Sequence, residues 1–359
     1  MFKIPFFGKS KKYLGVDIGT FSTKIVELSH TKKGTVLENY GERANKVNEG
    51  DIESGIKKKA FFSSDTEIAD NVKKILNEAK IETREAAFSI PDFMSFFTIF
   101  TTPPLPKEEI ASVVRFEARQ YIPLPLQEMT LDWSLIDENN KKDNKKNGFK
   151  ILLVAVPNKT ILKYQKVAEM TGIKVSTIEA EVFSLARAAV KKDDILKIIQ
   201  MVDIGIQSTT ITIVKNGLVC STYSVDFSIG EIIKQLASSL DISYNKSEEL
   251  IRVKGLKDEK IGFLLETQID RLISESNQVS GNYFKYEKKE VEKIIIAGGA
   301  ALIPGFVDYF SERIKKETQV TDPFSNISYP PLLKDVIKEM GPRYSVAVGL
   351  ALRDIENKK

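Results

Sequence analysis

One short pattern occurs twice in this chain: an apolar run that ends in Asp-Ile-Gly, a polar turn, and a second run rich in β-branched residues. The first copy is YLGVDIGTFSTKIVEL, residues 13–28, and the second is IIQMVDIGIQSTTITIV, residues 198–214. Each copy has the pattern of two strands joined by a tight turn. Because a long stretch of chain separates them, they indicate a duplicated supersecondary unit and not a short-period repeat array. We therefore expect a protein built from two like halves.

Composition narrows the classes of protein and of site. A length of 359 residues suggests about two domains with ordinary hydrophobic cores. The chain carries 53 Lys plus Arg and 49 Asp plus Glu, and a net charge of +4 is too small to indicate a nucleic-acid partner. The single cysteine, Cys220, excludes an internal disulfide and fits a reducing compartment. Because His30 is the only histidine, the usual His/Cys metal sites are excluded, and we expect His30 in a solvated turn.

The amino-terminal segment MFKIPFFGKSKK, residues 1–12, mixes apolar and aromatic side chains with lysines. Its apolar run is too short for a signal peptide or a transmembrane helix, so we expect a cytoplasmic protein. A frayed tail is the leading interpretation of this segment, and a weak contact with a membrane surface or a partner is the alternative.

The repeated turn suits the binding of a nucleotide. Glycine lets the backbone approach an anion, and Thr20, Ser22 and Thr23 add hydroxyl donors for phosphate oxygens. An aspartate at the end of a buried strand suits a hydrated Mg²⁺ beyond that strand. One copy alone would be an ordinary hairpin. Two copies that face each other across a cleft could hold a triphosphate from both sides.

A third segment, VEKIIIAGGAALIPGFVDYF at residues 291–310, has the pattern of a strand, a Gly-Gly turn and a helix that begins near Pro304. A turn without side chains at Gly298 and Gly299 would let a flat base or a ribose approach the backbone closely. Taken alone, this signal is weak.

In this order, the three motifs resemble the phosphate 1, phosphate 2 and adenosine motifs of the actin-like ATPase superfamily. The resemblance implies an α/β fold of two duplicated RNase H-like halves around a nucleotide cleft. It extends over nearly the whole chain, because residues 178–190 and 344–353 resemble the two connecting helices of that fold. Small residues in the second of these segments would permit close helix packing.

Residues 89–172 distinguish this chain within the superfamily. They read as a strand, a helix, a hairpin and a further helix that Asn158 could cap, and we interpret the charged loop DENNKKDNKKNG as a solvated loop. The insert, with EARQYIPLPL followed by LDW, resembles that of the PilM family of type IV pilus machines. FtsA proteins have an insert at this place and an amphipathic membrane helix at the end, a pattern that residues 351–359 do not show, and sugar kinases lack the insert.

The resemblance implies four subdomains, with a small α+β insert in place of one actin subdomain. Subdomain IA carries the first phosphate turn and the connecting helices, IC is the partner-binding insert, IIA carries the second phosphate turn and the adenosine turn, and IIB completes the second half. The ranges are residues 13–90, 172–200 and 343–356 for IA, 91–171 for IC, 201–226 and 290–342 for IIA, and 227–289 for IIB.

The resemblance also implies which residues bind ATP and Mg²⁺. Asp17 and Asp203 would face the ion through water molecules. Glu181 stands where chaperone-like relatives hold the acid that orients the attacking water, although an acid at a helix N-terminus is equally a partner of the helix dipole. The other positions implied to contact the nucleotide are Gly19, Thr20, Ser22, Thr23, Lys24, Gly205, Gln207, Ser208, Thr209, Glu248, Arg252, Gly298, Gly299 and Ala300.

Two positions depart from the family pattern. Ile251 stands where relatives have a lysine that reaches the nucleoside, and Arg252, four residues after Glu248 on the same helical face, is the candidate substitute. The segment FSIGE, residues 227–231, stands where relatives often have Gly-Gly. Affinity for the base or the ribose is therefore an open question.

The leading functional interpretation is an ATP-binding scaffold at the inner face of the cytoplasmic membrane. The resemblance implies that it binds the cytoplasmic N-terminal peptide of PilN, a single-pass protein of the inner-membrane assembly complex. The machine could be a pilus or a related type II secretion or competence system. The alternatives are an active ATPase or kinase and an FtsA-like membrane-associated filament protein, with ATP hydrolysis and self-association left open.

The resemblance places the peptide groove between the insert and subdomain IA. Most aromatic rings of the insert should serve its core, and the remainder could line a groove that takes an extended peptide. The candidate groove residues are Phe97, Ile99, Phe116, Tyr121 and Ile122.

Overall fold

The computed structural model describes residues 11–45, 64–136 and 148–356. Residues 1–10 of the amino-terminal tail and 137–147 of the charged loop, both singled out from the sequence, lie outside the described residues. Within those ranges, no helix combines the length and the apolar character needed to cross a lipid bilayer.

Two sheets repeat one strand order, which confirms the duplication. In each sheet three antiparallel strands are followed by two parallel ones, and the first sheet has a short sixth strand at its edge. The order in the first sheet is β14 (Ile327–Ser328), β3 (Gly34–Ala44), β2 (Ser22–Thr31), β1 (Lys12–Ile18), β4 (Glu85–Ile90) and β8 (Lys174–Ala180). The order in the second sheet is β11 (Leu218–Val225), β10 (Thr209–Lys215), β9 (Ile198–Ile204), β12 (Lys293–Gly298) and β13 (Glu317–Val320).

The turns of the two meanders follow from local backbone chemistry. Asn216 and Gly217 have φ values of 53° and 75°, as the Asn-Gly turn between β10 and β11 requires. The prediction for His30 is wrong, because the turn lies after Thr31 and His30 is the penultimate residue of β2. Its Nδ1 lies 3.1 Å from the hydroxyl of Thr35 across the hairpin.

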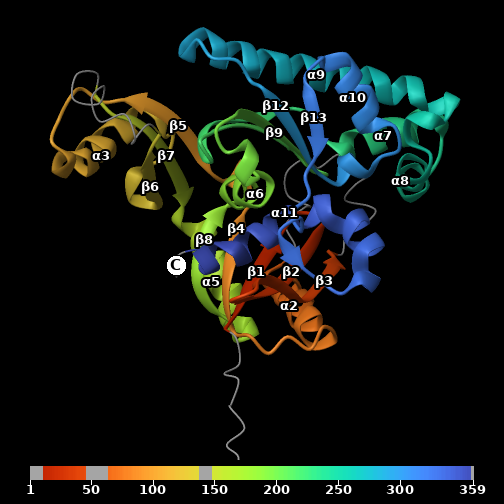
Figure 1. The fold of residues 1–359 in the computed structure, drawn as a ribbon, viewed down its shortest axis with the longest axis horizontal. Helices are drawn as coiled ribbons and strands as arrows, with labels where there is room; N and C mark the ends of the chain where they lie inside the picture. Colours follow the sequence, from red (N-terminus) through yellow and green to blue (C-terminus); the bar gives the residue numbers. More distant parts are fainter. Residues whose placement is uncertain (1–10, 46–63, 137–147, 357–359) are drawn as a thin grey trace, which may run out of the picture.

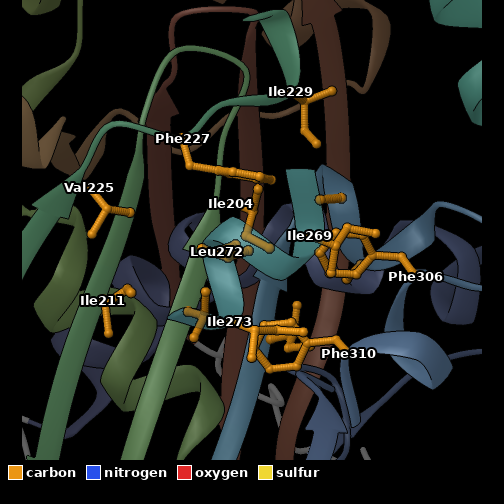
Figure 2. Packing of buried hydrophobic residues seen from close by; sticks show 14 of the residues in the cluster. Ile204, Ile211, Val225, Phe227, Ile229, Ile269, Leu272, Ile273, Phe306 and Phe310 are labelled. Carbon is orange, nitrogen blue, oxygen red and sulfur yellow. The ribbon is translucent and has the colours of Figure 1, made fainter. Parts of the chain in front are cut away.

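Helices cover both faces of each sheet. On one face of the first sheet, a buried cluster joins β1, β2 and β4 to α2 (Asp65–Glu78) and α5 (Asn158–Thr171). On one face of the second sheet, a larger cluster joins its strands to α7 (Ile229–Leu240), α8 (Tyr244–Val253), α9 (Glu259–Glu287) and α10 (Phe306–Ile314). Figure 2 shows this second cluster, where Ile204 of β9, Leu272 of α9 and Phe310 of α10 come together.

Two helices cross between the sheets (Figure 1), and they are the predicted connecting helices: α6 (Glu181–Ala189) and α11 (Lys334–Glu356). The crossing is so close that a Cβ added to Gly349 of α11 would lie 1.9 Å from the Ser184 carbonyl oxygen of α6. A Cβ added to Gly15 of β1 would lie 2.1 Å from the Ala347 carbonyl oxygen of α11. Gly349, one of the small residues predicted to permit close packing, therefore lies at a backbone contact that a side chain would prevent, and Gly15 is a second such position.

The insert forms its own three-stranded sheet and lies at the side of the molecule (Figure 1). Its elements are β5 (Phe96–Thr101), α3 (Ile110–Tyr121), β6 (Met129–Leu135) and β7 (Lys150–Pro157), with β7 in the centre of the sheet. The predicted hairpin of β6 and β7 is confirmed, whereas the pairing of β5 with β7 was not foreseen.

The helix after the insert begins differently from the prediction. Asn158 is the first residue of α5 and makes no side-chain cap. Its side chain instead accepts a hydrogen bond from Thr130 at 2.9 Å and donates one to the Gln127 carbonyl at 2.9 Å, which ties α5 to the start of β6. The four-subdomain division stays a prediction, and the packing of α5 against α2 and the first sheet favours an insert that ends at Pro157.

The helix crossing predicts opposite effects for two glycine substitutions. Gly349→Ala should lower the free energy of unfolding by about 1–3 kcal/mol, because the methyl group must push α6 and α11 apart. Gly281→Ala is the matched control, since no atom lies within 4 Å of its Cβ position on α9. It should raise the stability by up to about 1 kcal/mol through helix propensity. Urea denaturation of both variants measures the difference, and equal effects would contradict the tight crossing.

Candidate functional site

Two aspartates occupy equivalent places in the two halves. Asp17 is the penultimate residue of β1 and Asp203 is the penultimate residue of β9. The turns that follow are closed in the same way: the Gly19 N–H donates to the Ser22 carbonyl at 3.1 Å, and the Gly205 N–H donates to the Ser208 carbonyl at 3.0 Å. The duplicated sequence therefore produces a duplicated turn, with a carboxylate at the base of each copy.

Neighbouring strands hold the Asp17 carboxylate. Lys24 pairs with Asp17 in the β1–β2 register, and its Nζ lies 3.8 Å from Oδ2. The Ser89 hydroxyl, from β4, donates to Oδ1 at 2.9 Å. Burial raises the pKa of Asp17 even though Lys24 and Ser89 act in the opposite direction. This carboxylate is therefore fixed in position and only partly compensated in charge.

The hydroxyls of the first turn are used within the protein. Ser22 donates to Glu42 at 2.8 Å, and Thr23 donates to the side-chain oxygen of Asn45 at 3.4 Å. The Asn45 amide in turn donates to the carbonyls of Gly19 and Thr20 at 2.9 and 3.2 Å. These bonds stiffen the turn, so its backbone N–H groups and Thr20 are better placed than Ser22 and Thr23 to meet a ligand.

The second turn contains polar atoms without partners. Among the described residues, neither the Gln207 Oε1 nor the Thr209 Oγ1 has a hydrogen-bond partner, and both atoms are buried. A buried polar atom left unpaired costs about 1–3 kcal/mol, so it commonly marks a place for water or a ligand. The Thr209 hydroxyl can donate to a phosphate oxygen, whereas the Gln207 Oε1 can only accept, for example from a water molecule.

The predicted adenosine turn packs directly against the second turn. Gly298 pairs with Ile204 in the β12–β9 register and has a φ of 83°. A Cβ at this position would lie 2.3 Å from the Ile204 carbonyl oxygen and 2.8 Å from the Asp203 carboxylate. No atom lies within 4 Å of the Cβ position of Gly299. Gly298 is therefore required by the packing, and Gly299 faces open space.

The residues expected near the nucleoside form a separate group on α8. Ile251 is 2% exposed and belongs to the core of the second half, so a lysine there would bury its charge. Burial raises the pKa of the half-buried Glu248, while the exposed Arg252 lowers it. Glu248 also helps to raise the pKa of Tyr244 to about 12, a shift that burial dominates. None of the contacts described for these side chains joins them to the phosphate turns.

Glu181 lies where the sequence placed it, as the first residue of α6. Burial raises its pKa well above the ordinary range, and the charges of Asp17, Asp92 and Asp203 raise it further. The two strand-end aspartates and Glu181, which come from distant parts of the sequence, are therefore brought within electrostatic reach of one another.

Asp92 is the site residue that the sequence interpretation missed. It lies two residues after the end of β4, and its Oδ1 accepts a hydrogen bond from the Val182 N–H at 3.1 Å. Burial raises the pKa of Asp92 to about 7, and the charge of Asp203 contributes. Burial raises the pKa of Asp203 to about 6, with the charge of Asp17 adding to it. The available signal was FSIPD, in which an aspartate follows a strand after one proline.

The residues present fit a hydrated magnesium ion better than a directly bound one. Within the described ranges, no group of three or more Asp, Glu, His or Cys side chains is arranged to hold an ion directly. The four acids nevertheless lie in one largely buried region. The positive charge of Lys24 lowers the pKa of Asp17 and of Asp203. Water molecules between the carboxylates and Mg²⁺ would satisfy both observations, because this ion gives up its water reluctantly.

Four of the five candidate groove residues divide into two sets. Phe97 and Ile99 pack inward against the cluster around α6, with the rings of Phe97 and Phe183 6.5 Å apart. Phe116 and Tyr121, on α3, are 63% and 44% exposed. The structure therefore does not bring all five candidates to one surface.

A cavity of about 290 Å³ lies at the C-terminal end of α3. The predicted groove residue Ile122 lines it, and Arg115 and Arg119 supply positive charge. The sequence interpretation missed these two arginines. The remaining lining residues, Leu124, Pro125, Leu126 and Gln127, belong to the segment that follows α3.

The raised pKa of Asp92 predicts a pH dependence of stability. Between pH 3.8 and about pH 7 this carboxyl is mostly protonated in the folded protein and mostly ionised in the unfolded chain. Its contribution to the free energy of unfolding is therefore full below pH 3.8 and is lost as the pH rises through about 7. Asp92→Asn removes the titration at constant size. The fall in urea midpoint between about pH 5 and about pH 8 should therefore be smaller than in the wild type.

The exposed Asp193→Asn is the matched control and should keep the wild-type slope. Identical slopes in all three proteins would contradict the direction of the Asp92 shift.

Comparison with known proteins agrees with this geometry. A solved structure described as a PilM–PilN type IV pilus biogenesis complex is similar at a TM-score of 0.80 and 19% identity, over 96% of this chain and 98% of that chain. A structure of MreB5 of Spiroplasma citri bound to AMPPNP is similar at a TM-score of 0.51 and 11% identity, over 98% and 100% of the two chains. These likenesses confirm the actin-like ATPase fold.

Two sequence comparisons complete the assignment. The cell division protein FtsA of Bacillus subtilis (strain 168) is 21% identical, over 94% of this chain and 82% of that protein. The family model of the type IV pilus assembly protein PilM matches residues 15–355. With the match covering almost every described element of both halves and of the insert, the chain belongs to the PilM family of type IV pilus assembly proteins.

Proposed function

We propose that this chain binds Mg-ATP between its two phosphate turns and acts as a scaffold that holds a PilN-like membrane protein. The observation that carries the nucleotide proposal is the pair of equivalent strand-end carboxylates, Asp17 and Asp203, each below a turn closed in the same way. The likeness in fold to an AMPPNP-bound MreB supports it.

Each part of the site has a role in the proposal. Asp17 and Asp203 orient the water molecules of Mg²⁺, and Lys24 restrains the first carboxylate. The backbone N–H groups of the two turns and the Thr209 hydroxyl meet the phosphates, while the unpaired Gln207 Oε1 accepts from a water molecule beside them. The nucleoside lies over Gly298, Gly299 and Ala300, with Glu248 and Arg252 at its outer side.

Hydrolysis is slow or absent in this proposal. The candidate for orienting a water molecule is Glu181, the first residue of α6. Burial and the charges of Asp17, Asp92 and Asp203 raise the pKa of its carboxyl well above the ordinary range. Such a carboxyl is protonated over more of the pH range and is a poorer base for a transient water molecule. The proposed chain is therefore a nucleotide-loaded scaffold and not a rapid ATPase.

The insert is the proposed partner site. Phe116 and Tyr121 place aromatic surface on α3 beside the cavity at its C-terminal end, where Arg115 and Arg119 lie. Exposed aromatic and arginine side chains are typical of the residues that dominate binding energy at interfaces. The similar PilM–PilN complex favours the cytoplasmic tail of a PilN-like protein as the ligand. Such binding would hold the chain at the inner face of the membrane.

The nucleotide proposal predicts that Asp17→Asn and Asp203→Asn each weaken Mg-ATP binding by about tenfold or more, or about 1.4 kcal/mol. The reason is that each change removes a negative charge that attracts the hydrated Mg²⁺, while it leaves the size of the side chain unchanged. Isothermal titration calorimetry gives the affinities, and phosphate release from the same samples reports turnover. Asp193→Asn is again the control. Wild-type affinity in both site variants would refute the proposal.

The partner proposal predicts that the double change Phe116→Ala and Tyr121→Ala weakens peptide binding by about tenfold or more, since exposed aromatic anchors contribute about 2 kcal/mol each at such sites. The ligand is a fluorescent peptide copied from the N-terminal tail of the PilN-like protein of the same genome. The measurement is fluorescence anisotropy.

The control for this experiment is Phe263→Ala, because Phe263 is 74% exposed but lies on α9, in the second half. The proposal requires control binding at the wild-type level. If the double variant also binds at that level, the α3 surface is not the peptide site.

A further inference from the structure

Asp92 stands where the insert leaves the first sheet. The last strand before the insert, β4, ends at Ile90, and Asp92 begins the single 3₁₀ turn η1 (Asp92–Met94). The Ser95 N–H donates to the Asp92 carbonyl at 2.9 Å, and β5 begins at the next residue. The direction in which the insert departs therefore depends on the backbone of this residue.

The side chain of Asp92 is tied to the start of α6. Its Oδ1 accepts from the Val182 N–H at 3.1 Å. The backbone of Asp92 also lies close enough to the Glu181 carboxyl to lower the pKa of that group. The residue at the N-cap position of α6, Ala180, makes no side-chain cap. Asp92 therefore supplies the missing cap from another element.

Asp92 also reaches the second phosphate turn. The Thr210 hydroxyl lies close enough to the Asp92 carboxylate to lower its pKa, and Thr210 pairs with Asp203 in the β9–β10 register. The charge of Asp203 acts on Asp92 as well. One buried side chain thus connects the first turn of the insert, the start of α6 and the strand pair that carries Asp203.

We propose that Asp92 is the positioning residue through which occupancy of the nucleotide cleft is passed to the insert. The inference rests on the proposed nucleotide binding. A cation held near Asp203 attracts the Asp92 carboxylate. Because Asp92 begins η1 and accepts from the Val182 N–H, its shift is passed to η1 and to the start of α6. The strands of the insert follow α6, because Leu152 and Val154 of β7 pack in the same cluster as Val182 and Leu185.

The experiment is hydrogen–deuterium exchange of the full chain, with and without Mg-AMPPNP at a concentration that saturates each variant. In the wild type, nucleotide should slow exchange in both phosphate turns and change exchange in β5, α3 and β7. Asp92→Asn should reduce the change in the insert to less than half, while the turns still respond. Asp193→Asn should keep both responses.

The choice of asparagine separates coupling from a purely structural role. The amide oxygen introduced by Asp92→Asn can still accept from the Val182 N–H, so a residue that only caps α6 would leave the insert response intact in this variant. Thr210→Val is the second variant; it removes one hydroxyl at nearly constant shape and should also weaken the insert response. If Asp92→Asn fails to fold in a thermal melt, Thr210→Val decides alone.

The outcomes distinguish this inference from the nucleotide proposal. A wild-type insert that ignores nucleotide while the turns respond would overturn the coupling and leave nucleotide binding intact. A full insert response in a folded Asp92→Asn, or in Thr210→Val where that variant decides, would do the same. Turns that show no protection in the wild type would remove the nucleotide proposal and the coupling with it.

Discussion

Four carboxyl groups in one largely buried region form the constraint on which the rest of this site depends. Asp17, Asp92, Glu181 and Asp203 all have raised pKa values, with burial as the leading cause. For Asp92, Glu181 and Asp203, repulsion from other acids of the group adds to the shift. Buried like charges are costly unless a cation or a proton compensates them. Among the described residues, the ion pair of Lys24 with Asp17 compensates one of the four directly. In the protein alone, Lys24 and the protons that the raised pKa values retain compensate these acids, and a bound cation would take the place of those protons.

The duplicated meander brings acids from distant segments together. A strand that ends in Asp-Ile-Gly directs its carboxylate to the end of its sheet. The parallel neighbouring strand, β4 or β12, supplies the residue that lies beside this carboxylate. In the first half this neighbour contributes Ser89, which donates to Asp17. In the second half it contributes Gly298, whose lack of a side chain leaves room for Asp203. The same topology thus produces two related but unequal surroundings.

The parts of this site that could be predicted from sequence are those encoded locally. A strand, a glycine turn and an Asn-Gly hairpin are specified by neighbouring residues, so the two meanders and the Gly298 turn were accessible from their motifs. Asp92 and Asn158 were not, because each takes its partner from a distant segment: Val182 for Asp92, and Thr130 for Asn158. Local spacing carries no information about such partners.

The same reasoning explains the candidate groove. Alternation along a strand predicts that some rings point inward, but the direction depends on which neighbour the strand acquires. The unforeseen pairing of β5 with β7 places Phe97 and Ile99 against the cluster around α6. The helix α3 has no such neighbour on its outer face within the described residues, so Phe116 stays exposed. The exposed set could be recognised only once the strand order of the insert was known.

The insert contacts both halves of the molecule, so its position depends on how the two halves are arranged. Lys150 of β7 forms an ion pair with Glu287 at the C-terminal end of α9, and Leu152 packs in the same cluster as Val219 and Cys220 of β11. At its other end the insert begins at Asp92, beside β4 of the first sheet. Any change in the angle between the halves must therefore strain one of these attachments or move the insert. A ligand that draws the two strand-end carboxylates together would act on that angle, and α3, at the outer side of the insert, is where the displacement would be available to a partner.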